Sequence, residues 1–347
     1  MRVLVVKLTS MGDILHVMPA LTDLARATPG LVVDWMVEES FREIPAWHPS
    51  VDRVIPVATR RWRKFRWSSI REFLKFRSVL VKQKYDVIID AQGLIKSAVF
   101  ARFAGLKRGG IRIGFSADSI KESLAAKLYQ KTVHVERDQH AIDRLRQLFA
   151  GGFAYQLAMP LSYGLDVPEN KSTKPRDSGT VMFFHATTWR SKHLPEQVWR
   201  RLIELAREDG YRVLVVWGNR QEKQRAERLV QGQANAVVLD QMTLTEIKEQ
   251  LEQCSGAIAV DTGLGHLAAA LGTPCASVYG STNSKFTGAV GDNQVVLQSE
   301  YPCSPCMSKQ CLKLTAQVIE PPCYLKTDSS SRVQAENIWQ ALFEKII

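Results

Sequence analysis

The sequence predicts an α/β protein made of two Rossmann-like, doubly wound domains that face one another across a cleft. In both halves, short apolar runs alternate with helical patterns, which is typical of βαβ units around a parallel sheet. The chain has 347 residues, 45% hydrophobic and 23% charged, so it is long and apolar enough for two cores. Each half also places a carboxylate, glycine and small polar residues directly after a strand, at 7–13 and at 261–266.

The amino-terminal half contains strand-like runs at 3–7, 32–37, 54–57 and 87–90, with helical patterns at 14–27, 70–84 and 94–104. We expect residues 1–162 to form the first domain. Residues 163–179 are polar and rich in Pro, Asn, Ser and Lys without periodicity, so we expect an interdomain linker there.

The second half repeats the pattern, with expected strands at 181–184, 213–217, 237–239, 257–260 and 276–279. We expect residues 180–330 to form the second domain. Gly210 and Gly272 stand where glycines commonly end helices, and 243–246 has the spacing of a capping box. The last segment, 331–347, has the pattern of a closing amphipathic helix that could pack on either domain.

The formal net charge of +11 is densest in one short block, 60–67, where five cations are interleaved with three aromatic residues. The block suits a solvated helix face, a nucleic-acid patch, or a contact to a membrane or glycolipid. Five cations would contribute up to about 5 kcal/mol at an anionic leaflet. No apolar run could span a bilayer and the apolar start is too short for a signal peptide. We therefore expect a cytoplasmic protein, or one that binds a membrane from that side.

Six cysteines occur in the chain, and four gather near its end, at Cys303, Cys306, Cys311 and Cys323. Their spacing differs from the paired Cys-x2-Cys motifs of zinc sites, and no histidine accompanies them. We therefore expect free thiols rather than a metal site or a disulfide framework, and we expect no cofactor.

Asp13 is the candidate catalytic residue of the first half. One interpretation is that it only caps the first helix by accepting a backbone N–H. The other is a general base, because Lys7, Ser10 and Gly12 crowd the same turn and His16 follows nearby. The positive end of a helix favours the ionised carboxylate, so such a base is deprotonated at neutral pH.

Two segments of the second half are candidate phosphate-binding sites. Residues 185–193 combine adjacent hydroxyls with a lysine, although a solvated loop is an equally good interpretation of that segment alone. Residues 261–266 place two glycines at a helix start, which exposes backbone N–H groups to an anion. Neither first strand is followed by Gly-x-Gly-x-x-Gly, which argues against a nicotinamide dehydrogenase. Glu222 and Met242 follow two further strands at the same sheet edge, where they suit a sugar hydroxyl and a purine.

With these motifs, the chain resembles the ADP-heptose:lipopolysaccharide heptosyltransferases over nearly its whole length, and within them most closely heptosyltransferase I. The segments that carry the resemblance are 7–13 with His16 and Pro19, 41–56, 60–64, 90–97, Thr187-Thr188 with Lys192, and 261–266. The resemblance implies a GT-B fold and an inverting, metal-independent transfer of heptose from ADP-heptose to the Kdo of Kdo2-lipid A, in the lipopolysaccharide inner core. It also implies a peripheral enzyme on the cytoplasmic face of the inner membrane, without a nucleic-acid partner.

The resemblance assigns a role to each candidate residue by position. Asp13 is expected to deprotonate the acceptor hydroxyl, and Lys192 to stabilise the departing ADP. Donor binding is assigned to Thr187, Thr188, Lys192, Glu222, Met242, Asp261, Thr262, Gly263, Leu264, Gly265 and His266. Acceptor binding is assigned to Ser10, Gly12, Arg60, Arg61, Arg63, Lys64, Gln92 and Lys121. Lys121 stands where close relatives carry an arginine, so the bidentate contact of a guanidinium is missing there.

Three alternatives stay open at this point. The Cys-rich segment is more similar to heptosyltransferase II, which adds the second heptose. The basic block is also compatible with a non-catalytic protein that binds acidic lipid or nucleic acid. A related nucleotide-sugar epimerase, or a glycosyltransferase for another sugar, would share the same cleft.

Overall fold

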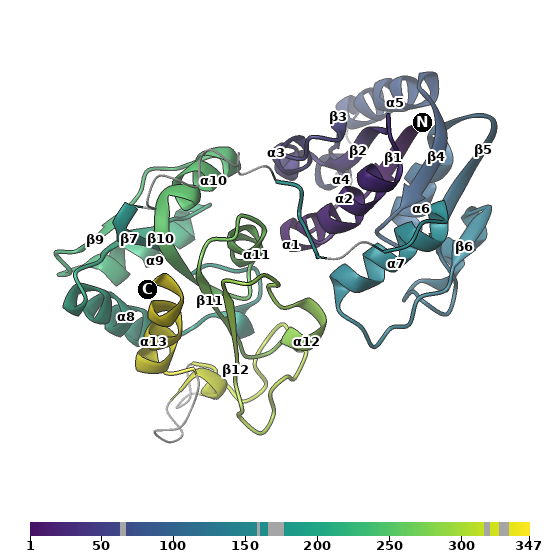
Figure 1. The fold of residues 1–347 in the computed structure, drawn as a ribbon. Coiled ribbons are helices and arrows are strands. Elements are labelled where there is room, and N and C mark those ends of the chain that lie inside the picture. Colours follow the sequence, from purple (N-terminus) through teal and green to yellow (C-terminus); the bar gives the residue numbers. More distant parts are fainter. Residues whose placement is uncertain (63–66, 158–159, 166–176, 316–319, 326–332) are drawn as a thin grey trace. The chain divides into compact units, whose positions relative to one another are not determined.

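The chain folds into two compact units, Met1–Asp166 and Val167–Ile347 (Figure 1). The computed structural model describes residues 1–62, 67–157, 160–165, 177–315, 320–325 and 333–347. Within these residues each unit holds one six-stranded parallel sheet with helices packed around it, so the predicted α/β class with two doubly wound sheets is confirmed. Arg63, Lys64 and most of the predicted linker lie outside the described residues.

The sheet of the first unit has the strand order β3–β2–β1–β4–β5–β6, and all neighbouring strands are parallel. Its strands are β1 (Arg2–Val6), β2 (Val32–Glu38), β3 (Val51–Val57), β4 (Lys84–Asp90), β5 (Gly105–Phe115) and β6 (Lys131–Val133). Its α-helices are α1 (Met11–Leu15), α2 (Met18–Ala27), α3 (Glu43–Ala46), α4 (Thr59–Trp62), α5 (Trp67–Lys82), α6 (Ile95–Phe103) and α7 (Ala141–Phe153), with short 3-10 turns η1 (Glu39–Phe41) and η2 (Ser123–Leu128).

The sheet of the second unit repeats this order as β12–β11–β10–β7–β8–β9. Its strands are β7 (Asp177–Phe184), β8 (Arg212–Val215), β9 (Ala236–Val238), β10 (Cys254–Val260), β11 (Cys275–Tyr279) and β12 (Gln294–Gln298). Its helices are α8 (Glu196–Glu208), α9 (Arg220–Val230), α10 (Leu244–Gln253), α11 (Gly263–Ala270), α12 (Ser284–Thr287) and α13 (Ala335–Ile346), with 3-10 turns η3 (Arg190–Lys192) and η4 (Pro322–Tyr324).

Both sheets therefore reverse their sequence order once, between β1 and β4 and between β7 and β10. The loops that leave such a strand pair cross to opposite faces of the sheet, which opens a crevice at the carboxyl ends of the strands. Ligands of doubly wound sheets bind in this crevice. The segments 7–13 and 261–266 leave β1 and β10, so both predicted motifs lie at the switch point of their sheet.

Some elements differ from the sequence prediction. Strands β5, β6 and β12 and helix α7 were not predicted, and the helix expected over 14–27 is two helices. Strand β5 contains four glycines and three basic residues, a composition poor in strand formers, but its pairing with β4 outweighs local propensity. Helix α2 starts anew at Met18 with Pro19 in its first turn, where a missing N–H costs nothing.

Other local predictions are confirmed. Gly210 and Gly272 have φ of +81° and +63° just after α8 and α11, a backbone region that glycine adopts most readily. Thr243 and Glu246 form the predicted capping box at the start of α10. Helix α13 packs on α8, β10 and β11, so the closing helix belongs to the second unit. One boundary differs from the prediction, because strand β7 begins at Asp177, inside the segment 163–179 that was predicted as a linker.

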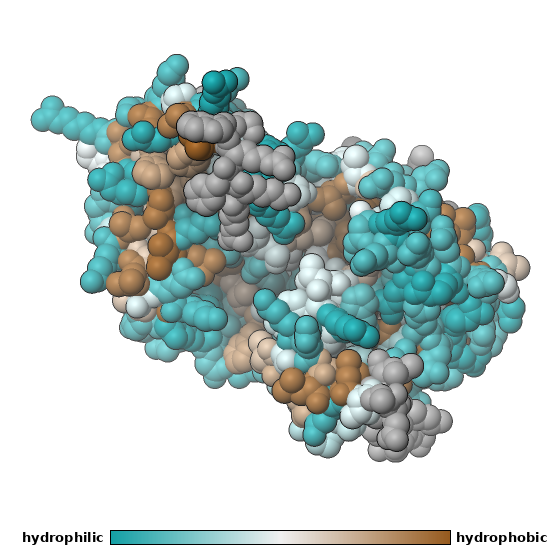
Figure 2. Space-filling view, turned by 180° about the vertical axis from the view of Figure 1, so that it is seen from behind, coloured by the Kyte–Doolittle hydropathy of each residue, from teal (hydrophilic) through white to brown (hydrophobic). Residues whose placement is uncertain are grey.

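The face shown in Figure 2 is largely hydrophilic, with hydrophobic side chains in separate patches. Among the side chains of helix α5 that the structure describes, the apolar residues Ile70, Leu74 and Val81 are exposed. Among the described residues, no helix combines the length and the apolar character needed to cross a membrane.

Candidate active site

The turn after β1 places Asp13 in the first turn of α1. Asp13 Oδ2 accepts hydrogen bonds from the backbone N–H of Ser10 at 2.9 Å and from the Ser10 hydroxyl at 2.6 Å. Asp13 Oδ1 lies 3.9 Å from the ammonium of Lys7, and 44% of the Asp13 side chain is exposed. The carboxylate therefore caps the helix and at the same time remains open to solvent. Gly12, beside it, is buried.

Lys7 connects this turn to the end of β4. Its ammonium donates to the carbonyl of Ala91 at 3.1 Å, and its side chain is only 8% exposed. Burial lowers the pKa of Lys7, and the charges of Asp13 and Asp90 partly offset that effect. Lys7 thus provides a buried positive charge beneath the Asp13 carboxylate.

Gln92, a predicted acceptor residue, holds the same two turns together. Its side-chain carbonyl accepts from the backbone N–H groups of Leu8 at 3.0 Å and Thr9 at 3.3 Å. Because that oxygen is engaged by the backbone, the amide NH2 is the group that Gln92 can offer to a ligand. Ser10, Gly12, Asp13 and Gln92 therefore gather at the switch point between β1 and β4.

Asp90 fixes the turn that carries Gln92, a role that the sequence reasoning missed. It is fully buried, and its carboxylate accepts from Tyr129 at 2.7 Å, Ser97 at 2.8 Å and two backbone N–H groups. Burial raises the pKa of Asp90 even though these donors lower it. Gly93 follows with φ +69°, and a Cβ there would lie 2.8 Å from Ile120. The run Asp-Ala-Gln-Gly after a strand was the available signal for this buried support.

The basic block is only partly free for a ligand. Arg61 donates to Glu39 at 2.8 Å and to both oxygens of Glu72 at 2.5 and 3.1 Å. This pairing holds the pKa of Glu72 below its usual value. Arg60 is exposed, and its backbone N–H donates to the carboxylate of Glu38 at 3.3 Å.

Lys121, the remaining acceptor candidate, is exposed just before η2. The preceding residues are fixed by two guanidinium groups, since Arg144 donates to the carbonyl of Ser119 and Arg137 to that of Ile120. These two hydrogen bonds fix the backbone just before Lys121 and so fix the position of Lys121 within the first unit.

In the second unit, the structure brings Lys192, Asp261 and Thr187 together. Lys192 Nζ lies 2.6 Å from Asp261 Oδ2, with side-chain exposures of 14% and 8%. The Thr187 hydroxyl donates to the backbone carbonyl of Asp261 at 2.9 Å. The Thr282 hydroxyl, which sequence reasoning missed, donates to Asp261 Oδ2 at 2.5 Å, the carboxylate oxygen that Lys192 contacts. These residues follow the neighbouring strands β7, β10 and β11, at the switch point of the second sheet.

Arg225, whose side chain is 12% exposed, orders the loop that carries Thr187, Thr188 and Lys192. Arg225 donates to the carbonyl of His185 at 2.8 Å and contacts His193 Nδ1 at 2.6 Å, while His193 Nε2 bonds to the carbonyl of Thr187 at 2.9 Å. Burial and the Arg225 charge lower the pKa of His193. Since the guanidinium donates to Nδ1 and a carbonyl can only accept, the ring carries its proton on Nε2. Burial also lowers the pKa of His185 to about 3. Arg225 gave no signal in the sequence because its partners lie far away along the chain.

Helix α11 begins directly after Asp261, with Thr262 at its N-cap. At Gly265, a Cβ would lie 3.0 Å from Ala259 and 3.2 Å from Ser277, so the glycine lets the helix lie close against the sheet. The first turn of α11 thus places the N-terminal amides of Gly263 and Leu264 next to Asp261 in the chain, and His266 in the same helix is buried.

The two nucleoside candidates lie at the ends of β8 and β9. Glu222 accepts from the backbone N–H of Gly218 at 2.7 Å and from the Asn219 amide at 2.6 Å, and so closes the start of α9. Met242 is half-buried just before α10. Strands β10, β7, β8 and β9 are consecutive in the sheet, so all the donor candidates share one edge, as predicted.

Comparison with known proteins places the chain in a family. The model of the family described as Glycosyltransferase family 9 (heptosyltransferase) matches residues 73–316. The chain belongs to glycosyltransferase family 9. It is 48% identical to lipopolysaccharide heptosyltransferase 1 of Pseudomonas aeruginosa over 314 residues, covering 90% of this chain and 87% of that relative. Lipopolysaccharide heptosyltransferase 1 of Escherichia coli K12 is 43% identical over 303 residues, covering 86% and 94%.

Solved structures share the fold of this family-9 glycosyltransferase. E. coli heptosyltransferase WaaC with ADP matches with a TM-score of 0.79 at 43% identity, covering 85% of this chain and 92% of that one. The same enzyme with ADP-2-deoxy-2-fluoro heptose gives 0.78 at 42% identity, covering 86% and 93%. E. coli ADP-heptose heptosyltransferase II gives 0.74 at 18% identity, covering 100% and 98%, a likeness of fold. The predicted family and GT-B fold are confirmed.

The cysteine-rich segment contacts the Lys192 loop. Ser191 donates to the carbonyl of Ser308 at 2.6 Å, and the backbone N–H of Ser191 donates to the carbonyl of Lys309 at 3.3 Å. All six cysteines are free thiols, and burial raises the pKa of Cys323 to about 12. No group of three or more potential ligands with metal-site geometry occurs in the described part of the chain.

Proposed function

We propose that this glycosyltransferase is a lipopolysaccharide heptosyltransferase 1, which transfers L-glycero-D-manno-heptose from ADP-heptose to the Kdo of Kdo2-lipid A. The observation that carries the proposal is the 43–48% identity to proteins of that name over most of the chain. We assign acceptor binding to the first unit and donor binding to the second, because the carboxylate candidate and the phosphate-binding candidates lie at the two separate switch points.

The chemical step is an inverting single displacement in this proposal. The acceptor hydroxyl gives its proton to Asp13 while its oxygen forms a bond to the anomeric carbon of heptose. The bond from that carbon to the β-phosphate oxygen breaks, and its electron pair leaves with ADP. The position of Asp13 supports this role because Ser10 fixes the carboxylate at an accessible edge above the buried Lys7.

The negative charge that develops on the departing diphosphate is met by Lys192, the hydroxyls of Thr187 and Thr188, and the N-terminal amides of α11. A diphosphate here would compete with Asp261 for the Lys192 ammonium, and the Thr282 hydroxyl would then remain on the Asp261 carboxylate. Since lysine and helix amides supply the positive charge, this mechanism needs no divalent metal and no cofactor. Glu222 and Met242 are proposed to contact the nucleoside.

We further propose that the protein acts at the cytoplasmic face of the inner membrane as a peripheral enzyme. The exposed Arg60 and the adjacent Arg63 and Lys64 would bind phosphates or carboxylates of the acceptor, with Lys121 as a further contact. Such contacts weaken as salt concentration rises, because exposed charges are screened.

The experiment that tests the function is ADP release from ADP-heptose with two acceptors. Kdo2-lipid A alone is expected to support release, whereas UDP- and GDP-sugars are expected not to replace the donor. Release that requires an already heptosylated acceptor would assign the protein to the second transfer instead. Salt-dependent DNA retention without ADP binding would refute the enzyme assignment altogether.

A further inference from the structure

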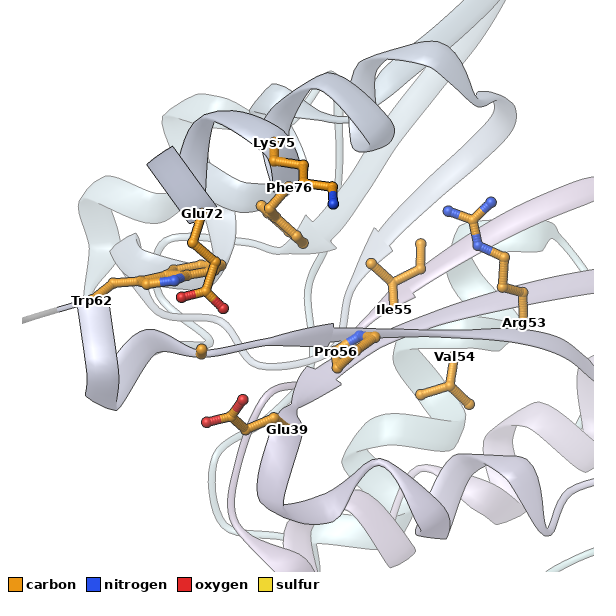
Figure 3. Close-up of a pocket in the computed structure, with 10 residues that line it drawn as sticks. Glu39, Arg53, Val54, Ile55, Pro56, Trp62, Glu72, Lys75 and Phe76 are labelled. Atoms are coloured by element: carbon orange, nitrogen blue, oxygen red, sulfur yellow. The ribbon is translucent and has the colours of Figure 1, made fainter. Parts of the chain in front are cut away.

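A pocket of about 450 Å³ lies beside the edge strand β3, under helices α4 and α5 of the first unit (Figure 3). Its apolar lining comes from Val54, Ile55, Pro56, Ala58, Trp62 and Phe76. The volume is within the range of small-ligand sites in proteins. Of these residues, the sequence analysis singled out Trp62, as one of the aromatic residues of the basic block 60–67.

Aromatic packing builds one wall of this pocket. The Trp62 ring lies 5.4 Å from Phe73 and 5.2 Å from Phe76, centroid to centroid. Figure 3 shows the Glu72 side chain running past the Trp62 indole, with Phe76 beside the ring and Ile55 on the strand opposite. The wall is therefore held by side chains that are themselves packed together, so the apolar surface exists without a ligand to order it.

The charges around the pocket are unequal. Its two carboxylates, Glu39 and Glu72, are both paired with Arg61. The two cations that line it, Arg53 and Lys75, form no ion pair within the described parts of the chain. In Figure 3 the Lys75 ammonium and the Arg53 guanidinium flank Ile55. An apolar interior with excess positive charge at one end fits an amphiphile with an anionic head.

We propose that this pocket binds one acyl chain of the anionic lipid acceptor, with the chain along Ile55, Trp62 and Phe76. An anionic group next to the chain would lie against Arg53 and Lys75. The identity of the lipid as acceptor rests on the proposed function, whereas chain binding itself does not. The pocket would thus fix the lipid part of the substrate to the unit that carries Asp13.

The first test measures binding of decyl, dodecyl and tetradecyl phosphate to the full chain, below their micelle concentrations and without ADP-heptose. Each methylene buried in the pocket is expected to strengthen binding by up to about fourfold, until the chain outgrows the pocket and the affinity levels off. Inorganic phosphate and dodecyl maltoside should bind far more weakly. Affinity independent of chain length would overturn the proposal, and so would equal binding of the neutral detergent.

Variants locate the chain. Val54→Asp puts a charge on the pocket wall and is expected to remove the chain-length dependence, whereas Leu74→Asp changes an exposed side chain outside the pocket and should not. Lys75→Gln should weaken dodecyl phosphate binding two- to fivefold, with Lys82→Gln on the same helix as control. Thermal unfolding shows that each variant is folded. Equal losses in Val54→Asp and Leu74→Asp would refute the assignment.

Two readouts keep the proposal testable even if Val54→Asp fails to fold. In Trp62→Phe, quenching of tryptophan fluorescence by a dodecyl phosphate brominated at its chain end should fall, because the ring beside the chain is gone. With active enzyme, Phe76→Ala should lower kcat/KM for Kdo2-lipid A more than for its deacylated form, because only the acylated acceptor would place a chain along Phe76. Unchanged quenching would refute binding beside Trp62. Equal effects on both acceptors would show that the chain is not that of the acceptor. If the unaltered protein binds alkyl phosphates but transfers no heptose, the proposed function is refuted and chain binding in the pocket still stands.

Discussion

The ion pair between the largely buried Lys192 and the buried Asp261 allows stabilisation and catalysis to be separated by experiment. At 2.6 Å and an effective dielectric constant of 20, the attraction of two unit charges is about 6 kcal/mol before the cost of desolvation. Removal of one partner from a buried pair typically costs about 3–5 kcal/mol, because the other charge stays buried alone. Thr282 still donates to Asp261, so we expect Lys192→Met to lower the free energy of unfolding by about 3 kcal/mol.

The double variant Lys192→Met with Asp261→Asn removes both charges. Since no unpaired charge remains, most of the lost stability should return, with a coupling energy of about 2 kcal/mol between the two sites. Transfer should not return, because the group that meets the leaving diphosphate is absent. Its loss should lower kcat by about 10²–10³-fold in the single and in the double variant.

Urea unfolding and ADP release measure the two effects. Lys309→Met is the matched control, because Lys309 is an exposed lysine whose ammonium lies 5.8 Å from the same Trp189 ring that Lys192 approaches at 4.6 Å. It should change neither quantity appreciably. A double variant as unstable as Lys192→Met would refute the electrostatic argument. A double variant with restored turnover would remove Lys192 from the chemistry.

Three further predictions follow from single side chains. Asp13→Asn, which keeps the shape of the carboxylate, should lower turnover about 10²–10⁴-fold with donor affinity little changed, measured by ADP release and ADP titration; unchanged turnover would exclude Asp13 as the base. Gly93→Ala should lower the free energy of unfolding by about 1–3 kcal/mol, because φ is +69° and the new Cβ would meet Ile120; an unchanged urea midpoint would contradict this. His185 has a folded pKa of about 3 against about 6.5 unfolded, so it stabilises the protein fully above pH 6.5 and progressively less as pH falls toward 3. Between pH 7 and pH 5, His185 therefore lowers the free energy of unfolding by about 2 kcal/mol. Urea unfolding of His185→Gln should show a pH dependence that is weaker by this amount. The same pH dependence in the variant and the unaltered protein would contradict the prediction.

Local patterns were sufficient to predict the elements whose signals lie within a few residues. The capping box at Thr243 and the helix-ending Gly210 need only neighbours in sequence, and both occur as predicted. Strand β5 was missed because its glycines and basic residues carry no strand pattern, and it is a strand because it pairs with β4 and β6. Strand order depends on such long-range pairing. The resemblance and the βαβ pattern therefore predicted doubly wound sheets, but not the order of the individual strands.

The site shows the same limit. The sequence predicted Lys192, Thr187 and Asp261, since each stands in a motif after a strand. It did not predict Thr282 or Arg225, because their hydrogen-bond partners lie 21 and 32 residues away and no local spacing connects them. Arg61 was assigned to acceptor binding by the resemblance, as part of the basic block 60–64. Its pairing with Glu39 and Glu72 depends on how helices α4 and α5 fold against η1.

The two interpretations of Asp13 that the sequence left open are compatible in the structure. A helix cap normally uses a side-chain oxygen for backbone N–H groups, and here the Asp13 carboxylate also takes the Ser10 hydroxyl on the same oxygen. Both contacts involve Oδ2, so they fix the orientation of the carboxylate without burying it, and Oδ1 is left on the side of Lys7. A base must be held in place and still reach its proton, and a capping residue at the switch point of a doubly wound sheet meets both requirements.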